Sequence, residues 1–328
     1  MAAAERGTAD PAPGGLGARV WVALAIVYVV WGSTYLAIKF VVETIPPMLG
    51  GGARFLTAGL ILLPAVVLLR GRSALRATPA QLGTAAVSGV LLLLGGNGLV
   101  SVGEQRVSSG VAALIIACVP LWIVVLRTLL RDRPVPATAL GVLIGFAGVA
   151  LLFLPGGRDG GVDPGYAALV VLASLSWSVG SLLVTRLPVP ADPLTLTTVE
   201  MVVGGAAMLV AGAAAGEPSR FDAGAVSGRS WLALVYLVAF GSLVAFTAYV
   251  WLLGHAPVSV VSTYAYVNPA VAVLLGAVFA GEGLTGPTLA GGLLILVAVA
   301  LVVTAEGRAS RLARRDRAAA EGRTDLAA

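Results

Sequence analysis

Three ionisable residues lie within or at the edge of long apolar runs, where chemistry is possible but charge is costly. Lys39 ends the first run, Arg54 lies in the second and Glu200 lies in the seventh. A charge at the centre of a lipid-facing helix costs roughly 2.5–3.5 kcal/mol, so we expect these groups to face protein or water.

Arg54 and Glu200 could act in three ways. They could form an ion pair, with each other or with a third group, that opens and closes as the protein changes shape. Glu200 could instead be a proton-coupling carboxylate. The structural alternative is that both side chains pair permanently or snorkel to the lipid headgroups.

Lys39 could be an interfacial anchor at the end of the first run. It could also attract an anionic or carboxylate group, or pair with Glu43 four residues later.

Aromatic and hydroxyl side chains share a helical face in two of the runs. Tyr28, Trp31 and Tyr35 are spaced at i, i+3 and i+7, so they would lie on one side of a helix. The same spacing recurs in the sixth run at Ser174, Trp177 and Ser181. Such faces could form a mixed apolar and polar cavity wall, or they could be helix-packing surfaces with interfacial aromatics.

Prolines interrupt the fourth and ninth runs at Pro120 and Pro269. An internal proline removes a helix hydrogen bond, and the freed carbonyl must find a partner in protein or in a wet cavity. We therefore predict kinked helices that line a cavity. Tyr264 and Asn268 could supply polar contacts beside the second kink.

Glycine runs at 95–98 and 141–145 would let helices approach one another closely. Asn97 is the polar member of the first run that could face a bound solute.

The composition excludes a soluble protein. Of 328 residues, 58% are hydrophobic and 11% charged, with a mean hydropathy of +0.97, whereas soluble domains are near a quarter charged. The net charge of +5 comes from arginines spread over connections and a tail, which argues against nucleic-acid binding. One cysteine, Cys118, and one histidine, His255, leave no disulfide, metal-site or cofactor pattern.

The apolar runs predict an all-helical membrane protein with ten transmembrane helices, because each run approaches the ~20 residues needed to cross the hydrocarbon. The predicted spans are 20–39, 46–69, 80–102, 108–130, 135–154, 165–186, 193–214, 231–253, 258–280 and 285–305. The alternation typical of barrel strands is absent.

Arginine placement predicts the orientation of these spans. With the N-terminus inside, the cytoplasmic segments hold 15 arginines and the outer connections hold 4. We therefore expect a multi-pass plasma-membrane protein with both termini cytoplasmic. Glu104, Arg106 and His255 fall at span ends and are interpreted as solvated loop residues.

The two halves of the chain resemble each other. A shift of 146 residues places Trp31 on Trp177 and Pro47 on Pro193. Because five is an odd number of spans, duplication would give an inverted 5+5 repeat. That architecture places a site near the midplane, between halves that can expose it to either side.

Several motifs, taken in order, resemble the EamA family of the drug/metabolite transporter superfamily. They are Trp31-Gly32-Ser33-Thr34 through Lys39, Arg54-Phe55, Pro120, Asn268-Pro269 and Gly281-Glu282. The resemblance implies EamA-type halves at 20–154 and 165–305. Composition alone predicts a disordered cytoplasmic N-terminus at 1–19, which is rich in Ala, Gly and Pro, and a basic cytoplasmic tail at 306–328. The resemblance also implies a central cavity lined mainly by spans 1, 3, 4, 6, 8 and 9. The family's glutamate after span four is absent, and Asp132 would be its only substitute.

The sequence therefore predicts a secondary transporter, not an enzyme, that works by alternating access. We expect it to export small amphipathic or zwitterionic metabolites, such as amino acids or related compounds, or toxic compounds. Protons are a possible coupling partner, the lipid bilayer is the surroundings, and the oligomeric state stays open. A channel or scaffold, and a membrane-embedded enzyme acting on lipid-linked substrates, are the alternatives. Neither the rings of polar residues that suit a channel nor clustered acid and base groups are visible.

Overall fold

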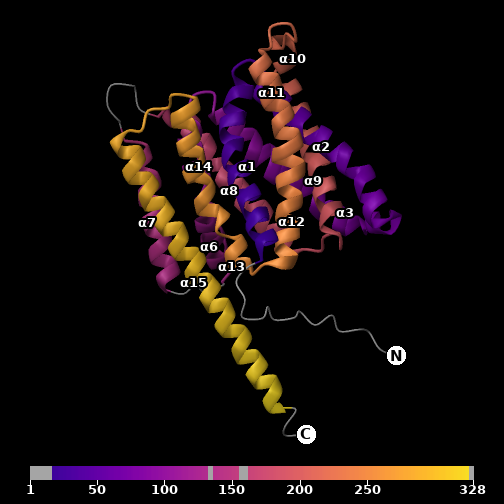
Figure 1. Cartoon of the computed structure of the whole chain (residues 1–328), viewed down its shortest axis with the longest axis vertical. Coiled ribbons are helices and arrows are strands. Elements are labelled where there is room, and N and C mark those ends of the chain that lie inside the picture. Colours follow the sequence, from indigo (N-terminus) through magenta and orange to yellow (C-terminus); the bar gives the residue numbers. More distant parts are fainter. Residues whose placement is uncertain (1–16, 132–135, 155–161, 325–328) are drawn as a thin grey trace.

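The computed structural model describes residues 17–131, 136–154 and 162–324, and this part of the chain is a bundle of helices (Figure 1). Eight helical segments are long and apolar enough to cross a membrane. Two shorter apolar helices, Thr138–Leu152 and Tyr264–Phe279, accompany them. Leu69, Leu143 and Val210 are 74%, 70% and 70% exposed, as expected of side chains that face lipid.

The helices up to residue 152 follow the predicted runs closely. They are α1 (Ala18–Val42), α2 (Pro47–Arg70), η1 (Arg72–Leu75), α3 (Pro79–Gly89), η2 (Val90–Gly98), α4 (Leu99–Gly103), α5 (Ser109–Ile116), α6 (Val119–Leu129) and α7 (Pro136–Leu152). The segments α3, η2 and α4 form one continuous span. The N-terminal segment predicted to be disordered lies mostly outside the described residues, as does Asp132.

The helices from residue 164 onward repeat this order. They are α8 (Pro164–Arg186), α9 (Pro193–Ala214), α10 (Glu217–Arg220), α11 (Gly228–Tyr236), η4 (Leu237–Val244), α12 (Ala245–His255), α13 (Val258–Val261), α14 (Tyr264–Phe279) and α15 (Gly286–Thr324). The last helix continues through the predicted basic tail and extends beyond the bundle (Figure 1).

Local sequence signals begin several of these helices. Proline occupies the first turn of α2, α8 and α9, where its missing N–H costs nothing. Asp163 and Asp192 accept backbone hydrogen bonds at the starts of α8 and α9.

Two helix pairs pack closely through glycines. The pair α2 and α9 meets at Gly52 and Gly205, where a Cβ on Gly205 would lie 2.5 Å from the backbone nitrogen of Leu56. The pair α7 and α15 meets at Gly148 and Gly291, each facing the other's carbonyl oxygen. The sequence expectation concerned other glycines, and it is confirmed at Gly141, which lies against Val302 of α15, and at Gly145, which lies against Ala298 of α15.

Between these pairs lie helices that connect one half of the chain with the other. Helix α1 packs against α14, α12 and α11, whereas α8 packs against η2, α4 and α6. The first helix of each half is therefore surrounded by the later helices of the other half.

Two spans contain π-helical segments at matching places in the chain. The segment η2 begins at Val90 and η4 at Leu237. A π-helix is rare and is frequently found at functional sites, because the wider turn displaces side chains and carbonyls. The sequence analysis did not predict either segment.

Candidate functional site

A cluster of three aromatic rings lies between α1 and the helices of the second half. The ring of Trp31 lies 5.1 Å from that of Tyr249 and 5.4 Å from that of Tyr264, centroid to centroid. Tyr249 and Tyr264 are 5.7 Å apart with nearly perpendicular planes. Beside the cluster, Tyr28 shares a hydrogen bond with the hydroxyl of Thr263. The structure therefore brings together Tyr28, Trp31 and Tyr264, and adds Tyr249, which sequence reasoning missed.

Polar groups border this aromatic cluster. The indole Nε1 of Trp31 donates to the carbonyl of Gly241 in the π-helical segment η4, at 3.2 Å. Asn268 lies one turn after Tyr264 on α14, and its Oδ1 is buried without a hydrogen-bond partner among the described residues. A buried unpaired acceptor is costly, so a donor that reached Asn268 would be bound favourably.

The equivalent face of α8 makes different contacts. Ser174 is fully buried and accepts a hydrogen bond from Trp122 Nε1 at 3.0 Å. Trp177 lies against Gly96, where a Cβ would come within 2.7 Å of its ring. Ser181 and Asn97 are half-buried and, in the described part of the chain, their side chains form no hydrogen bond.

Arg54 is buried, and its exposed fraction is 6%. Its Nε donates to Ser242 Oγ at 3.0 Å, and its guanidinium carbon lies 4.4 Å from the centre of the Phe55 ring. Among the described residues no carboxylate pairs with it. Arg54 therefore connects α2 with the π-helical segment of the other half, which excludes the simple snorkelling interpretation.

Glu200 occupies the matching position on α9. Its Oε1 accepts a hydrogen bond from Ser88 Oγ on α3 at 2.7 Å. In this conformation Arg54 and Glu200 do not pair with each other, so the mutual ion pair that the sequence allowed is not formed. Each charge instead contacts a serine of the opposite half.

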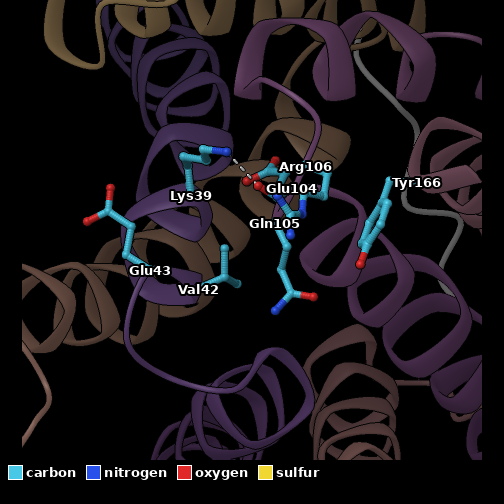
Figure 2. Close-up of a pocket in the computed structure, with 7 residues that line it drawn as sticks. All are labelled: Lys39, Val42, Glu43, Glu104, Gln105, Arg106 and Tyr166. Atoms are coloured by element: carbon cyan, nitrogen blue, oxygen red, sulfur yellow. Dashed lines mark hydrogen bonds between the residues drawn. The ribbon is translucent and has the colours of Figure 1, made fainter. Parts of the chain in front are cut away.

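Lys39 lies at the end of the bundle where α1 ends, α5 begins and α14 ends, which we call the Glu104 end. Its Nζ donates to the backbone carbonyl of Glu104 at 2.7 Å and reaches that of Val107 at 3.5 Å. Figure 2 shows the lysine amine directed at this turn. In this conformation Lys39 does not pair with Glu43, because Glu43 is bound by Arg229.

A cavity of about 320 Å³ opens beside Lys39 (Figure 2). It is lined by Lys39, Val42, Glu43, Glu104, Gln105, Arg106 and Tyr166.

The interpretation of Glu104 as a solvated loop residue is wrong. Its side chain is fully buried, and neither carboxylate oxygen has a hydrogen-bond partner among the residues that the structure describes. The connection between α4 and α5 is short, and both helices pack against α1 and α8. The shortness of this connection is the sequence signal that could have revealed the burial of Glu104. Burial raises the pKa of Glu104 well above its usual range; Lys39 opposes this shift and Glu282 adds to it. Arg106 and His255 are exposed as expected.

Two other glutamates hold helix starts at the Glu104 end. Glu282 accepts hydrogen bonds from the backbone nitrogens of Ser109 and Gly110 on α5, at 2.6 and 3.1 Å. Glu217 accepts them from Met48 and Leu49 on α2, at 3.2 and 2.8 Å. A carboxylate at a helix N-terminus satisfies free N–H groups and complements the helix dipole. Both contacts join the two halves of the chain.

The prolines shape their spans differently from a simple kink. The fourth span breaks at Ala117 and Cys118, and Pro120 stands in the first turn of α6. In the ninth span the break comes at Ser262 and Thr263, before α14, and Pro269 lies inside that helix.

Tyr35 packs against the main hydrophobic core rather than joining Trp31 and Tyr28.

No group of three or more His, Cys, Asp or Glu side chains in the described part of the chain could hold a metal ion. The candidate site consists of aromatic rings, single hydrogen-bonding groups and isolated charges, which is chemistry that can bind a solute.

Comparison with known proteins agrees with this picture. Over 264 residues the chain is 39% identical to the inner membrane transporter YedA of Escherichia coli strain K12, which covers 80% of this chain and 83% of YedA. It is 28% identical to the transporter YvbV of Bacillus subtilis, over 86% of this chain and 90% of YvbV. A WAT1-related chloroplastic protein of Arabidopsis thaliana is 27% identical, over 88% of this chain and 70% of that protein.

One crystal structure shares the fold with a TM-score of 0.59 at 22% identity, covering 90% of this chain and 98% of the other. The EamA-like transporter family matches the chain twice, at residues 19–154 and 165–304. With two matches that together span most of its length, this chain belongs to the EamA-like transporter family, and it is a multi-pass membrane transporter rather than an enzyme.

Proposed function

We propose that this transporter exports a small amphipathic or zwitterionic solute by alternating access, using ten spans arranged as an inverted 5+5 repeat. The solute binds between α1 and α14. Export, rather than uptake, is the direction implied by the resemblance to EamA-type exporters.

The observation that carries the proposed site is the unpaired Oδ1 of Asn268 beside the rings of Trp31, Tyr249 and Tyr264. An ammonium group is attracted to the faces of aromatic rings and is a hydrogen-bond donor. The apolar ring surfaces suit the remainder of an amphipathic solute. Trp31 belongs to the first family match, and Tyr249, Tyr264 and Asn268 belong to the second. A change in the relative position of the two halves would therefore open or close the site.

Three features support the inverted repeat. The first helix of each half packs on later helices of the other half. The π-helical segments begin at matching places. Arg54 and Glu200 contact serines of the opposite half in a reciprocal manner. An odd number of spans per half would produce this reciprocity.

The positive-inside rule supports an orientation with both termini in the cytoplasm and the Glu104 end outside. YedA is named an inner membrane transporter, which supports a plasma-membrane location for this chain.

Export from cells that produce the protein tests this function. Extracellular metabolites are compared by mass spectrometry between cells with the wild-type chain, Asn268→Leu, Trp31→Leu and an empty vector, at matched membrane expression. We expect one class of amine-containing solute to appear outside wild-type cells and to decline at least tenfold in both variants.

Trp21→Leu is the matched control, because Trp21 lies on the same helix with 56% of its surface exposed. Export in this control should equal that of the wild type. Equal export by Asn268→Leu and Trp31→Leu would reject the site, and a wild type indistinguishable from the empty vector would reject export.

A further inference from the structure

Glu104 differs from every other carboxylate whose side chain the structure describes. The others accept at least one hydrogen bond; they are Glu43, Asp163, Asp192, Glu200, Glu217, Asp222, Glu282 and Glu306. Both oxygens of Glu104 are buried and accept none from the described part of the chain. An ionised carboxylate in such a place costs several kcal/mol unless it is paired.

The surroundings of Glu104 contain the means to change its charge. Lys39 is close enough to influence the carboxyl group, yet its amine binds backbone carbonyls of the same turn instead. A lysine amine has three donors, so Lys39 could exchange a carbonyl for the carboxylate with a small movement. The neighbouring cavity of about 320 Å³ gives the outside a route to this turn.

We propose that Glu104 is the proton-binding residue of this transporter and that Lys39 is its alternating partner. In the described conformation the carboxyl carries its proton, and Lys39 holds the carbonyls of the turn. When the Glu104 end is open, the carboxylate takes up this proton from the outer water; when the other end opens, the proton leaves toward the cytoplasm, and the resulting carboxylate binds the ammonium of Lys39. The assignment rests on the proposed transport function, because it names the ion to which transport is coupled.

Several other charged or titratable groups must be considered beside Glu104 and Lys39. Glu282, which follows α14, accepts three hydrogen bonds from Ser109 and Gly110 of α5. These donors are directed at Glu282 and do not reach Glu104. Tyr35 on α1 lies close enough to Glu104 for the two groups to interact electrostatically. Glu43, Arg106 and Tyr166 line the cavity. Glu200, the earlier candidate for proton coupling, already accepts a hydrogen bond from Ser88.

Infrared difference spectroscopy on the full-length protein in proteoliposomes tests proton binding without any knowledge of the solute. We expect a protonated-carboxyl carbonyl band at neutral pH that disappears on alkalinisation. The band should be absent in Glu104→Gln and retained in Glu200→Gln. Persistence of the band in Glu104→Gln would overturn the proposal.

Two variants give opposite shifts that a purely structural role would not produce. Lys39→Met removes a positive charge that favours ionisation, so the band should persist to higher pH. Glu282→Gln removes a negative charge that opposes ionisation, so the band should disappear at lower pH. Unchanged midpoints in both variants would contradict the assigned neighbours.

The coupling itself is tested by measuring export against the outer pH. Wild-type export should increase when the outside is acidified, and Glu104→Gln should lose this dependence. The same dependence in Glu104→Gln and wild type would overturn the coupling. If the wild type exports nothing, the proposed function fails, whereas the infrared titration still decides whether Glu104 binds the proton.

Discussion

Arg54 of α2 is joined to Ser242 of the π-helical segment η4 by a hydrogen bond of 3.0 Å. The two residues are 188 positions apart in the chain and belong to the two different family matches. A buried guanidinium with one polar partner makes the interface between the halves sensitive to small changes at either residue.

We expect Ser242→Ala to destabilise the protein more than Arg54→Met does. Ser242→Ala leaves a buried donor unpaired, which costs about 1–3 kcal/mol. Arg54→Met removes the donor and keeps the length of the side chain, so Ser242→Ala should cost much less in that background. Thermal unfolding of the four proteins in detergent gives the coupling energy, which we expect to be about 0.5–3 kcal/mol. Additive effects would show that the contact does not stabilise the protein.

The stability of the wild type should decrease with rising pH in a manner that depends on Glu104. Its pKa is raised above 4.5 in the folded protein, so the folded state holds a proton that the unfolded state releases. The stabilisation is complete below pH 4.5 and is lost as the pH rises toward the raised folded pKa.

Unfolding temperatures of wild type and Glu104→Gln, measured across this pH range, test the linkage. The difference between them should change in favour of Glu104→Gln as the pH increases, since an amide cannot ionise. Parallel curves would show that Glu104 does not titrate within the range.

The contact between α2 and α9 should not tolerate a methyl group at Gly205. A Cβ there would meet the Leu56 nitrogen at 2.5 Å and the Gly52 carbonyl at 3.1 Å. We expect Gly205→Ala to destabilise the protein by about 1–3 kcal/mol, as overpacking does. Gly83→Ala is the control, because nothing lies within 4 Å of a Cβ at that exposed position. That change should be neutral or stabilising by up to about 1 kcal/mol, and equal effects at both sites would refute the packing argument.

Glu217→Ala should loosen the start of α2. Removing a helix cap costs about 0.5–2 kcal/mol, and here the cap comes from the other half of the chain. Hydrogen exchange should therefore accelerate at the amides of Met48 and Leu49. Asp163→Ala removes a cap within its own helix, so its effect should stay at the start of α8. Unaltered exchange at Met48 in Glu217→Ala would mean that the cap contributes no protection.

The helices were predictable because each apolar run has the length that a lipid bilayer requires. The run predicted at 193–214 coincides with α9, which begins at a proline after a capping aspartate. The π-helical segments were not predicted, because a shift from four to five residues per hydrogen bond leaves no mark in hydropathy.

The candidate site was predictable only in part. Trp31, Tyr28, Tyr264 and Asn268 were chosen by residue type and helical spacing. The structure places the three aromatic residues in one cluster, and the backbone oxygen of Asn268 lies against Gly32, next to Trp31. Equivalent positions in the two halves do not show whether Arg54 and Glu200 are close enough to pair. Each lies about 11 Å from the start of its helix, and the starts lie at opposite ends of a ~36 Å pair, which leaves about 14 Å between them along the bundle.

The 39 residues of α15 form a helix about 58 Å long, roughly twice the thickness of the hydrocarbon. Such a rod acts as a lever, since a rotation that is small where α15 packs against α7 becomes a large displacement at its far end. A tilt of about 10° would move that end by about 10 Å. A probe placed at that end, which projects beyond the bilayer, would report the conformation of the transporter.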